Sequence, residues 1–122
     1  MRSSGDEPSG VVYKILVRDA WDDACRSGVY HGSADDLRDG FIHLSSRAQL
    51  SGTLAKYFLG QNNLLLISFD SSDLGGKLKW EASRGGKFFP HFYGPLPTIL
   101  ARSVREIAID SEGIPFPPGD ME

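Results

Sequence analysis

The apolar run at residues 64–69 constrains the fold of this chain most strongly. It reads Leu-Leu-Leu-Ile-Ser-Phe and is bounded on both sides by residues that favour turns. A short continuous apolar run of this kind is typical of a strand that is buried on both faces. We therefore expect residues 64–69 to form a central strand, and the β-branched and aromatic segment at residues 11–17 to form the first strand.

Two principal helices are expected beside these strands. Asp19 is a candidate N-cap for the first helix, which would turn Trp21, Ala24 and Cys25 inward and end at Gly28. The second helix should begin after Ser45 or Ser46 and end at Gly60. Its inward residues recur at helical spacing: Leu50, Leu54, Tyr57 and Phe58.

Further strands are expected at residues 41–44 and 104–109, and a hairpin is expected from residues 78–81 and 87–89 around Gly85 and Gly86. The strands outnumber the helices and gather late in the chain, which favours an α+β fold over a doubly wound parallel sheet. We predict a mixed, split β-sheet of about five to seven strands with two principal helices.

The 122 residues are enough for one domain with one core. We expect a single α+β domain at residues 11–110, a disordered N-terminal tail at residues 1–10 and an extended proline-rich tail at residues 111–122. The lone cysteine, Cys25, excludes an intramolecular disulfide and suits a reducing compartment. With no secretory signal and no apolar run of membrane-spanning length, the sequence predicts a cytoplasmic protein that does not associate with membranes.

The net charge of −3 and the isoelectric point near 5.5 argue against a broad nucleic-acid surface. A small-molecule ligand is the better prediction, and the oligomeric state stays open. A metal is not expected, because the three histidines, His31, His43 and His91, follow no compact ligand spacing.

The segment at residues 80–96 combines aromatics, glycines and prolines with Glu81 and His91, a mixture that indicates a shaped pocket wall. His91 and Tyr93 alternate along one strand face, where a core edge and a ligand wall are both consistent with the pattern. Glu81 is either a solvated edge charge or a carboxylate tuned by the aromatic residue beside it.

His43 interrupts an otherwise apolar strand, so it is either a hydrogen-bonded core histidine or a functional group. Ser45 follows two residues later and points to the same side of the strand. The turn formed by His31, Gly32 and Ser33 leads into a capped helical turn, and it could hold a ribose or a phosphate or be a simple surface turn.

These residues resemble a small bacterial family, domain-of-unknown-function family 952, over nearly all of residues 13–109. The resemblance rests on these residues: Tyr13, Lys14, Ile15, Trp21, Gly32, Ser33, the run at 39–45, Gln49, Thr53, Trp80, Glu81 and the run at 89–96. The family has no established activity. It has been grouped with the ADP-ribosyltransferase fold, a split mixed sheet that holds NAD in a cleft.

That resemblance implies a possible NAD-dependent transferase in which Glu81 steadies the charge that develops at the ribose and His43 with Ser45 contacts the ribose. Tyr13 and Lys14 would lie on the first strand beside the ligand. Two alternatives stay open. The first is a non-catalytic module that binds a nucleotide or another small ligand, and the second is a protein interaction domain that uses the aromatic segment at residues 88–96.

Overall fold

A computed structural model describes residues 10–119. The predicted N-terminal tail lies outside these residues except for Gly10, as do the last three residues of the predicted C-terminal tail. The strands are β1 (Val11–Val17), β2 (Val29–Tyr30), β3 (Ile42–His43), β4 (Leu64–Asp70), β5 (Leu78–Ala82), β6 (Phe88–Phe92), β7 (Leu96–Pro97), β8 (Ala101–Ile109) and β9 (Pro115–Phe116). The helices are α1 (Arg18–Ser27), α2 (Ala34–Asp39), α3 (Leu50–Tyr57) and α4 (Ser71–Leu74), with short 3₁₀ segments at Arg47–Gln49, Gly75–Lys77, Arg84–Gly86 and Thr98–Leu100.

The strands form three sheets, in the orders β1-β4-β8-β9, β3-β6-β5 and β2-β7. The α+β class is confirmed, but the expected mixed sheet is wrong, because every strand pair in the described residues is antiparallel. A helix after a strand suggests a parallel crossover. Here five helices and strands intervene between β1 and β4, and the chain re-enters the sheet in the opposite direction.

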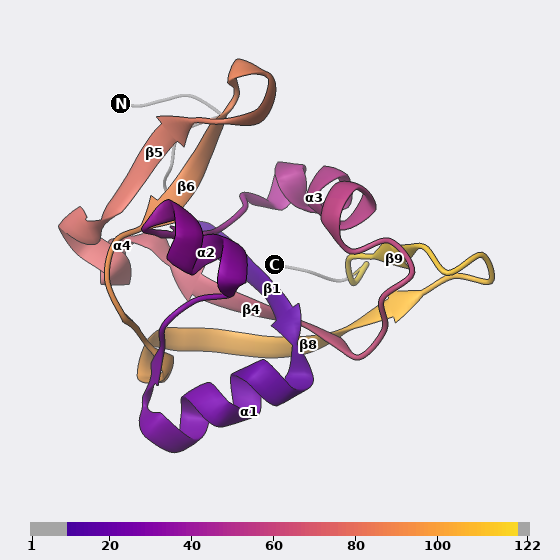
Figure 1. Cartoon of the computed structure of the whole chain (residues 1–122), viewed down its shortest axis with the longest axis horizontal. Coiled ribbons are helices and arrows are strands. Elements are labelled where there is room, and N and C mark those ends of the chain that lie inside the picture. Colours follow the sequence, from indigo (N-terminus) through magenta and orange to yellow (C-terminus); the bar gives the residue numbers. More distant parts are fainter. Residues whose placement is uncertain (1–9, 120–122) are drawn as a thin grey trace.

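The predicted central strand, β4, lies between β1 and β8 and is buried on both faces. Its residues Leu65, Ile67 and Phe69 pack with Trp21 and Ala24 of α1. Leu64 and Leu66 face the other way and pack with Leu50 and Leu54 of α3. The two helices therefore cover opposite faces of this sheet, while the β5–β6 hairpin projects from it (Figure 1).

Both principal helices form, but α3 begins at Leu50 after a 3₁₀ turn and ends at Tyr57, not at Gly60, and Tyr57 is exposed and not inward. Helix α1 begins at Arg18, so Val17 and not Asp19 is its N-cap, while Gly28 ends it in the left-handed conformation as expected. Cys25 is exposed and not inward, because the buried stripe of α1 consists of Trp21 and Ala24 and the next residue along the chain turns away from it.

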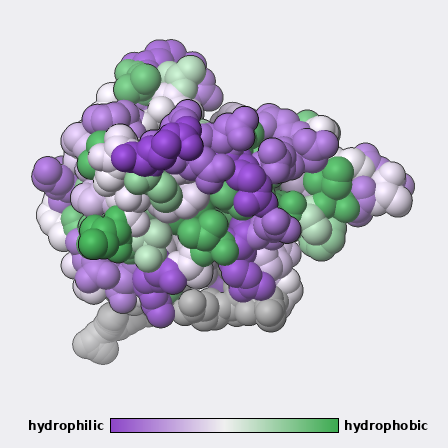
Figure 2. Space-filling view, turned by 90° about the horizontal axis from the view of Figure 1, so that it is seen from below, coloured by the Kyte–Doolittle hydropathy of each residue, from purple (hydrophilic) through white to green (hydrophobic). Residues whose placement is uncertain are grey.

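One face of the molecule is mainly polar (Figure 2). Seen from below, hydrophobic residues appear mostly as separate spots among hydrophilic ones (Figure 2). The longest described helix, α1, has ten residues, and none of the helices between residues 10 and 119 has the length and apolarity to cross a bilayer.

The segment that begins with β3 joins the two larger sheets. Ile42 and His43 pair with Phe92 and His91 of β6. Two residues later, the backbone of Ser45 exchanges hydrogen bonds of 2.8 and 2.9 Å with Tyr13 of β1. The short segment from β3 to Ser45 therefore lies where both sheets meet, and this is where the polar residues gather.

Candidate functional site

A cleft of about 220 Å³ opens where β1, α2, α3 and the segment after β3 meet. Five of the residues predicted from the sequence line it: Tyr13, Lys14, Ser33, His43 and Ser45. Acidic and basic residues of α2 complete its polar wall, namely Asp35, Asp36, Arg38 and Asp39, and Thr53 and Tyr57 contribute from α3. The structure thus brings together residues of β1, the Ser33 turn and β3 that are far apart in the sequence.

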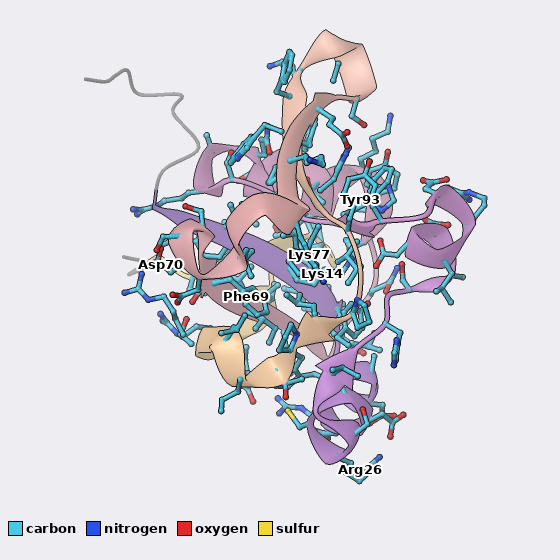
Figure 3. The ribbon with its side chains drawn as sticks, turned by 90° about the vertical axis from the view of Figure 1, so that its left-hand side faces the viewer. Lys14, Arg26, Phe69, Asp70, Lys77 and Tyr93 are labelled. Carbon is cyan, nitrogen blue, oxygen red and sulfur yellow. The ribbon has the colours of Figure 1, made fainter. Side chains whose placement is uncertain are left out.

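Lys14 is the buried cation of the cleft. Its side chain is only 9% exposed, and its Nζ donates to Asp36 Oδ2 at 2.9 Å and to the backbone oxygen of His43 at 3.0 Å. Figure 3 shows Lys14 among the interior side chains, whereas Arg26 lies at the periphery on α1. Burial lowers the pKa of Lys14, and the neighbouring Asp36 charge opposes that shift.

Asp36 is the centre of the hydrogen-bond network. Its carboxylate is 1% exposed and accepts from Lys14, from the backbone N–H of Ser33 at 2.8 Å and from the backbone N–H of His43 at 3.0 Å. Burial alone would raise its pKa, but the hydrogen bond from the His43 ring, the Lys14 charge and the two backbone donors outweigh burial and hold the pKa well below its usual range. The group is therefore a buried carboxylate at neutral pH.

Asp36 is not among the residues predicted from the sequence. The available signal was the capping box, in which the Ser33 hydroxyl accepts from the Asp36 backbone N–H and the Asp36 side chain accepts from the Ser33 backbone N–H. Gly32 is part of this arrangement, because a Cβ at its position would lie 2.7 Å from the Asp36 Cβ.

His43 is held through both of its ring nitrogens. Nδ1 lies 2.6 Å from Asp36 Oδ1, and Nε2 lies 3.0 Å from Asp39 Oδ2. Asp39 also pairs with Arg38, whose hydrogen bond is the main reason that the pKa of Asp39 is lowered. Both ring nitrogens of His43 are therefore already engaged by carboxylate oxygens. The ring is 32% exposed, so it forms the open rim of the cleft.

Among the described residues, no hydrogen bond joins the side chains of Ser45 and His43, although both lie on the same segment. The Ser45 hydroxyl lies 3.1 Å from the Thr53 hydroxyl of α3, and Ser45 is buried. A His43–Ser45 nucleophile pair is therefore not assembled. Ser45 and Thr53 instead offer two hydroxyl groups on the floor of the cleft.

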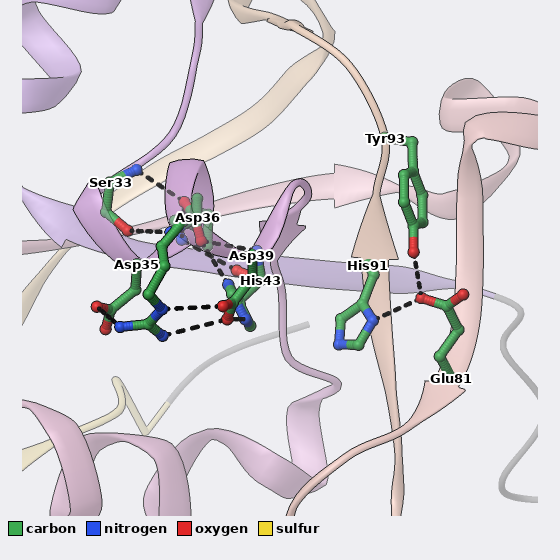
Figure 4. Close-up of polar contacts among 10 residues, drawn as sticks. Ser33, Asp35, Asp36, Asp39, His43, Glu81, His91 and Tyr93 are labelled. Atoms are coloured by element: carbon green, nitrogen blue, oxygen red, sulfur yellow. Dashed lines mark hydrogen bonds and ion pairs between the residues drawn. The ribbon is translucent and has the colours of Figure 1, made fainter.

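Glu81, His91 and Tyr93 form a second cluster beside the cleft. His91 Nδ1 and the Tyr93 hydroxyl each lie 2.8 Å from Glu81 Oε1 (Figure 4). The hydrogen bond from His91, followed by that from Tyr93, lowers the pKa of Glu81, and the same carboxylate raises the pKa of Tyr93. The ring of His91 lies 5.6 Å from that of His43 between centroids, and Phe41 contacts both rings.

His31 is the predicted residue that stays apart. It is exposed and lines, with Gly32, a shallow hollow beside α1, on the other side of the turn from the cleft. Among residues 10–119, no group of three or more histidine, cysteine, aspartate or glutamate side chains is arranged to hold a metal ion. The polar groups of the cleft are carboxylates, hydroxyls and two cations that are already paired, which suits ligand hydroxyl groups better than free phosphates.

Comparisons with known proteins identify relatives of this chain. The crystal structure of protein CC0527 from Caulobacter crescentus is 48% identical, with a TM-score of 0.84 over 87% of this chain and 93% of that one. The solution NMR structure of CC0527 is also 48% identical, with a TM-score of 0.79 over 86% and 90% of the two chains. A comparison with curated proteins found no match. The family model described as protein of unknown function (DUF952) matches residues 15–104, and the chain therefore belongs to the DUF952 family.

Proposed function

We propose that the cleft binds the ribose of a nucleotide, with NAD as the first candidate, and that the protein transfers or hydrolyses ADP-ribose in the manner of an ADP-ribosyltransferase-like enzyme. The observation that carries this proposal is the juxtaposition of a hydroxyl- and carboxylate-lined cleft with the Glu81 cluster next to it.

The size of the cleft supports binding of part of a nucleotide. Sites for drug-sized ligands usually measure roughly 300–1,000 Å³, whereas this cleft measures about 220 Å³. It is therefore suited to one sugar or one ring system, with the remainder of a dinucleotide outside it. Ribose hydroxyls can donate to Asp39 and exchange hydrogen bonds with Ser45 and Thr53, all of which line the cleft or its floor.

Glu81 would supply the electrostatic part of the reaction. In this chemistry the bond between ribose C1 and nicotinamide breaks, nicotinamide leaves with the electron pair, and positive charge develops on the ribose. A carboxylate near C1 stabilises that charge. Both hydrogen bonds to Glu81 end on Oε1, and its side chain is 38% exposed, so Oε2 is available to a ligand.

The direct test uses chromatography to measure whether the purified protein releases nicotinamide from NAD. Glu81→Gln should abolish turnover while leaving ADP-ribose binding, measured by calorimetry, nearly unchanged. Glu106→Gln is the matched control, because Glu106 is an exposed glutamate on β8 that pairs with Arg18. Full turnover by Glu81→Gln would remove Glu81 from the mechanism.

A non-catalytic nucleotide-binding module is the second candidate, and the geometry of His43 favours it. Because both ring nitrogens of His43 already contact carboxylates, this ring has no free nitrogen with which to take a proton. Binding of ADP-ribose without release of nicotinamide from NAD would support the module and contradict the transferase.

A further inference from the structure

The outer face of the β3-β6-β5 sheet carries a second arrangement of chemical groups. His91 of β6 is paired with His43 of β3 on one side and with Lys79 of β5 on the other. Because side chains alternate along a strand, Glu81 and Tyr93 lie on the same face as His91, while Ile42 and Phe92 turn to the core. This face therefore gathers a carboxylate and two imidazoles beside the cleft.

The His91 ring is held in one orientation. Its Nδ1 lies 2.8 Å from Glu81 Oε1, and the Tyr93 hydroxyl donates to the same oxygen at 2.8 Å. Since an ionised carboxylate only accepts hydrogen bonds, His91 Nδ1 carries the proton in this pair. In the neutral ring, Nε2 is then left with a lone pair that can accept a proton.

That lone pair has no partner in the described part of the chain. His91 Nε2 is buried and makes no hydrogen bond to any described residue, and the His91 side chain is only 4% exposed. A buried polar atom without a partner is uncommon in folded proteins and calls for an explanation. The Phe41 ring stacks on His91 with 4.0 Å between centroids and an interplanar angle of 23°, and it is itself only partly buried.

We propose that His91 Nε2 is the proton acceptor for the hydroxyl or water that attacks the ligand in the cleft, and that the Phe41 ring covers His91 until that group arrives. The reaction assigned to this base rests on the proposed function, whereas the presence of the base rests on the geometry alone. In the step, a lone pair of the attacking oxygen forms the new bond to ribose C1 while the bond from C1 to nicotinamide breaks and nicotinamide leaves with the electron pair of that bond, and the O–H bond of the attacking group breaks. The proton forms a bond to Nε2, and Glu81 stabilises the resulting imidazolium through Nδ1.

The position of His91 agrees with this role. Its ring lies 5.6 Å from that of His43, which is at the rim of the cleft, and Phe41 lies against both. His43 and His91 would then have different roles. His43 is fixed through both ring nitrogens, whereas His91 keeps one nitrogen that can accept a proton. Glu81 acts on His91 as a positioning residue, and Tyr93 positions Glu81.

Diethylpyrocarbonate modifies an accessible, unprotonated imidazole nitrogen. It therefore tests whether the Phe41 ring covers the His91 imidazole, the covered base, and it requires no nucleotide. Modification of each histidine is followed by mass spectrometry in wild type, Phe41→Ala and Phe88→Ala. The exposed His31 serves as the internal reference, and Phe88 as the matched control because it is an exposed phenylalanine on β6. We expect His91 to react at least about tenfold faster in Phe41→Ala than in wild type, and Phe88→Ala to resemble wild type.

Slow reaction of His91 in all three proteins would overturn the proposal, and so would fast reaction in wild type, since Phe41 would not be the cover. Nitrogen-15 NMR of the wild-type imidazoles provides a test that needs no variant. The proposal expects a proton on His91 Nδ1 and none on Nε2 near pH 7.5. A proton on Nε2, held there by an ordered water or another acceptor, would contradict it.

The link to catalysis needs one further variant. His91→Gln should lower kcat for nicotinamide release by about 100-fold, the usual size of a general-base effect, with a much smaller change in KM. Glu81→Ala should also shift the proton between the nitrogens of His91, because the carboxylate that holds the proton on Nδ1 is then missing. If NAD is not cleaved but His91 reacts rapidly in Phe41→Ala, the proposed function fails while the covered base stands.

Discussion

The two histidine–carboxylate pairs of this protein are built alike but buried in opposite ways. His43 Nδ1 lies 2.6 Å from Asp36, and His91 Nδ1 lies 2.8 Å from Glu81. In the first pair the carboxylate is 1% exposed and the imidazole 32%, while in the second the imidazole is 4% exposed and the carboxylate 38%. The pairs therefore differ in which partner is buried, and only the second leaves a ring nitrogen, His91 Nε2, without a hydrogen-bond partner among the described residues.

Under the proposed function, this difference separates a structural role for the first pair from a chemical role for the second. The buried Asp36 needs several donors to stay ionised, and the chain supplies them from β1, β3 and the Ser33 turn. Asp36 therefore joins three segments of the fold. Glu81 is partly solvated and needs fewer partners, so it can direct a buried imidazole whose second nitrogen remains unoccupied.

Replacing Lys14 by methionine should have the largest effect on stability. The variant leaves the Asp36 carboxylate buried without its cation, and removal of one partner of a buried ion pair costs about 3–5 kcal/mol. Urea unfolding at pH 7 measures the change. The double variant with Asp36→Asn should recover part of the loss, and a free energy of unfolding equal to that of wild type for Lys14→Met would contradict the structural role of this pair.

Replacing Asp36 by asparagine should change how stability depends on pH. The pKa of Asp36 is lower in the folded chain than the value of about 3.9 expected when unfolded. Its carboxylate therefore stabilises the fold above about pH 4, and this contribution, on the order of 2 kcal/mol, is lost as the pH falls further.

The measurement is the free energy of unfolding between pH 2 and 7. Wild type should lose more stability than Asp36→Asn across the acidic end of this range. Asp35→Asn is the control, because Asp35 is an exposed neighbour on α2 that pairs with Arg38. Parallel curves for wild type and Asp36→Asn would show that Asp36 is not a strongly held carboxylate.

The smallest effect on stability is expected for Tyr93→Phe, which removes one of two hydrogen bonds to a partly solvated carboxylate. Because that hydrogen bond lowers the pKa of Glu81, its loss should raise the pKa toward its ordinary value. Carboxyl carbon-13 NMR follows the titration, with Tyr57→Phe as a control on α3. An unchanged pKa of Glu81 would mean that Tyr93 does not position it.

Local signals in the sequence predicted much of the fold. The β-branched pattern of β1, the apolar run of β4 and the glycine-centred hairpin of β5 and β6 each formed as expected. The Ser33 cap also formed. These features depend on neighbours within a few residues, which is why they can be inferred without knowing the rest of the structure.

Which side chains pair with one another at the site could not be predicted, because these pairs join segments that are far apart in the sequence. Nothing local indicates that Lys14 meets Asp36, since an aspartate in the first turn of a helix is usually solvated. The alignment of His43 with His91 follows from the register of β3 on β6, which a single sequence does not encode locally. The sequence thus indicated several of the polar residues that gather at the site, whereas their partners and burial follow from the tertiary structure.

An NMR titration with ADP-ribose tests the account most directly, because it asks whether the cleft beside these two pairs is a ligand site. We expect saturable shifts of the backbone amides of Ser45, Thr53 and His43, with Ile109 at the far end of β8 unchanged. Absence of shifts at millimolar ADP-ribose, or shifts confined to the hollow beside α1 near His31, would contradict it.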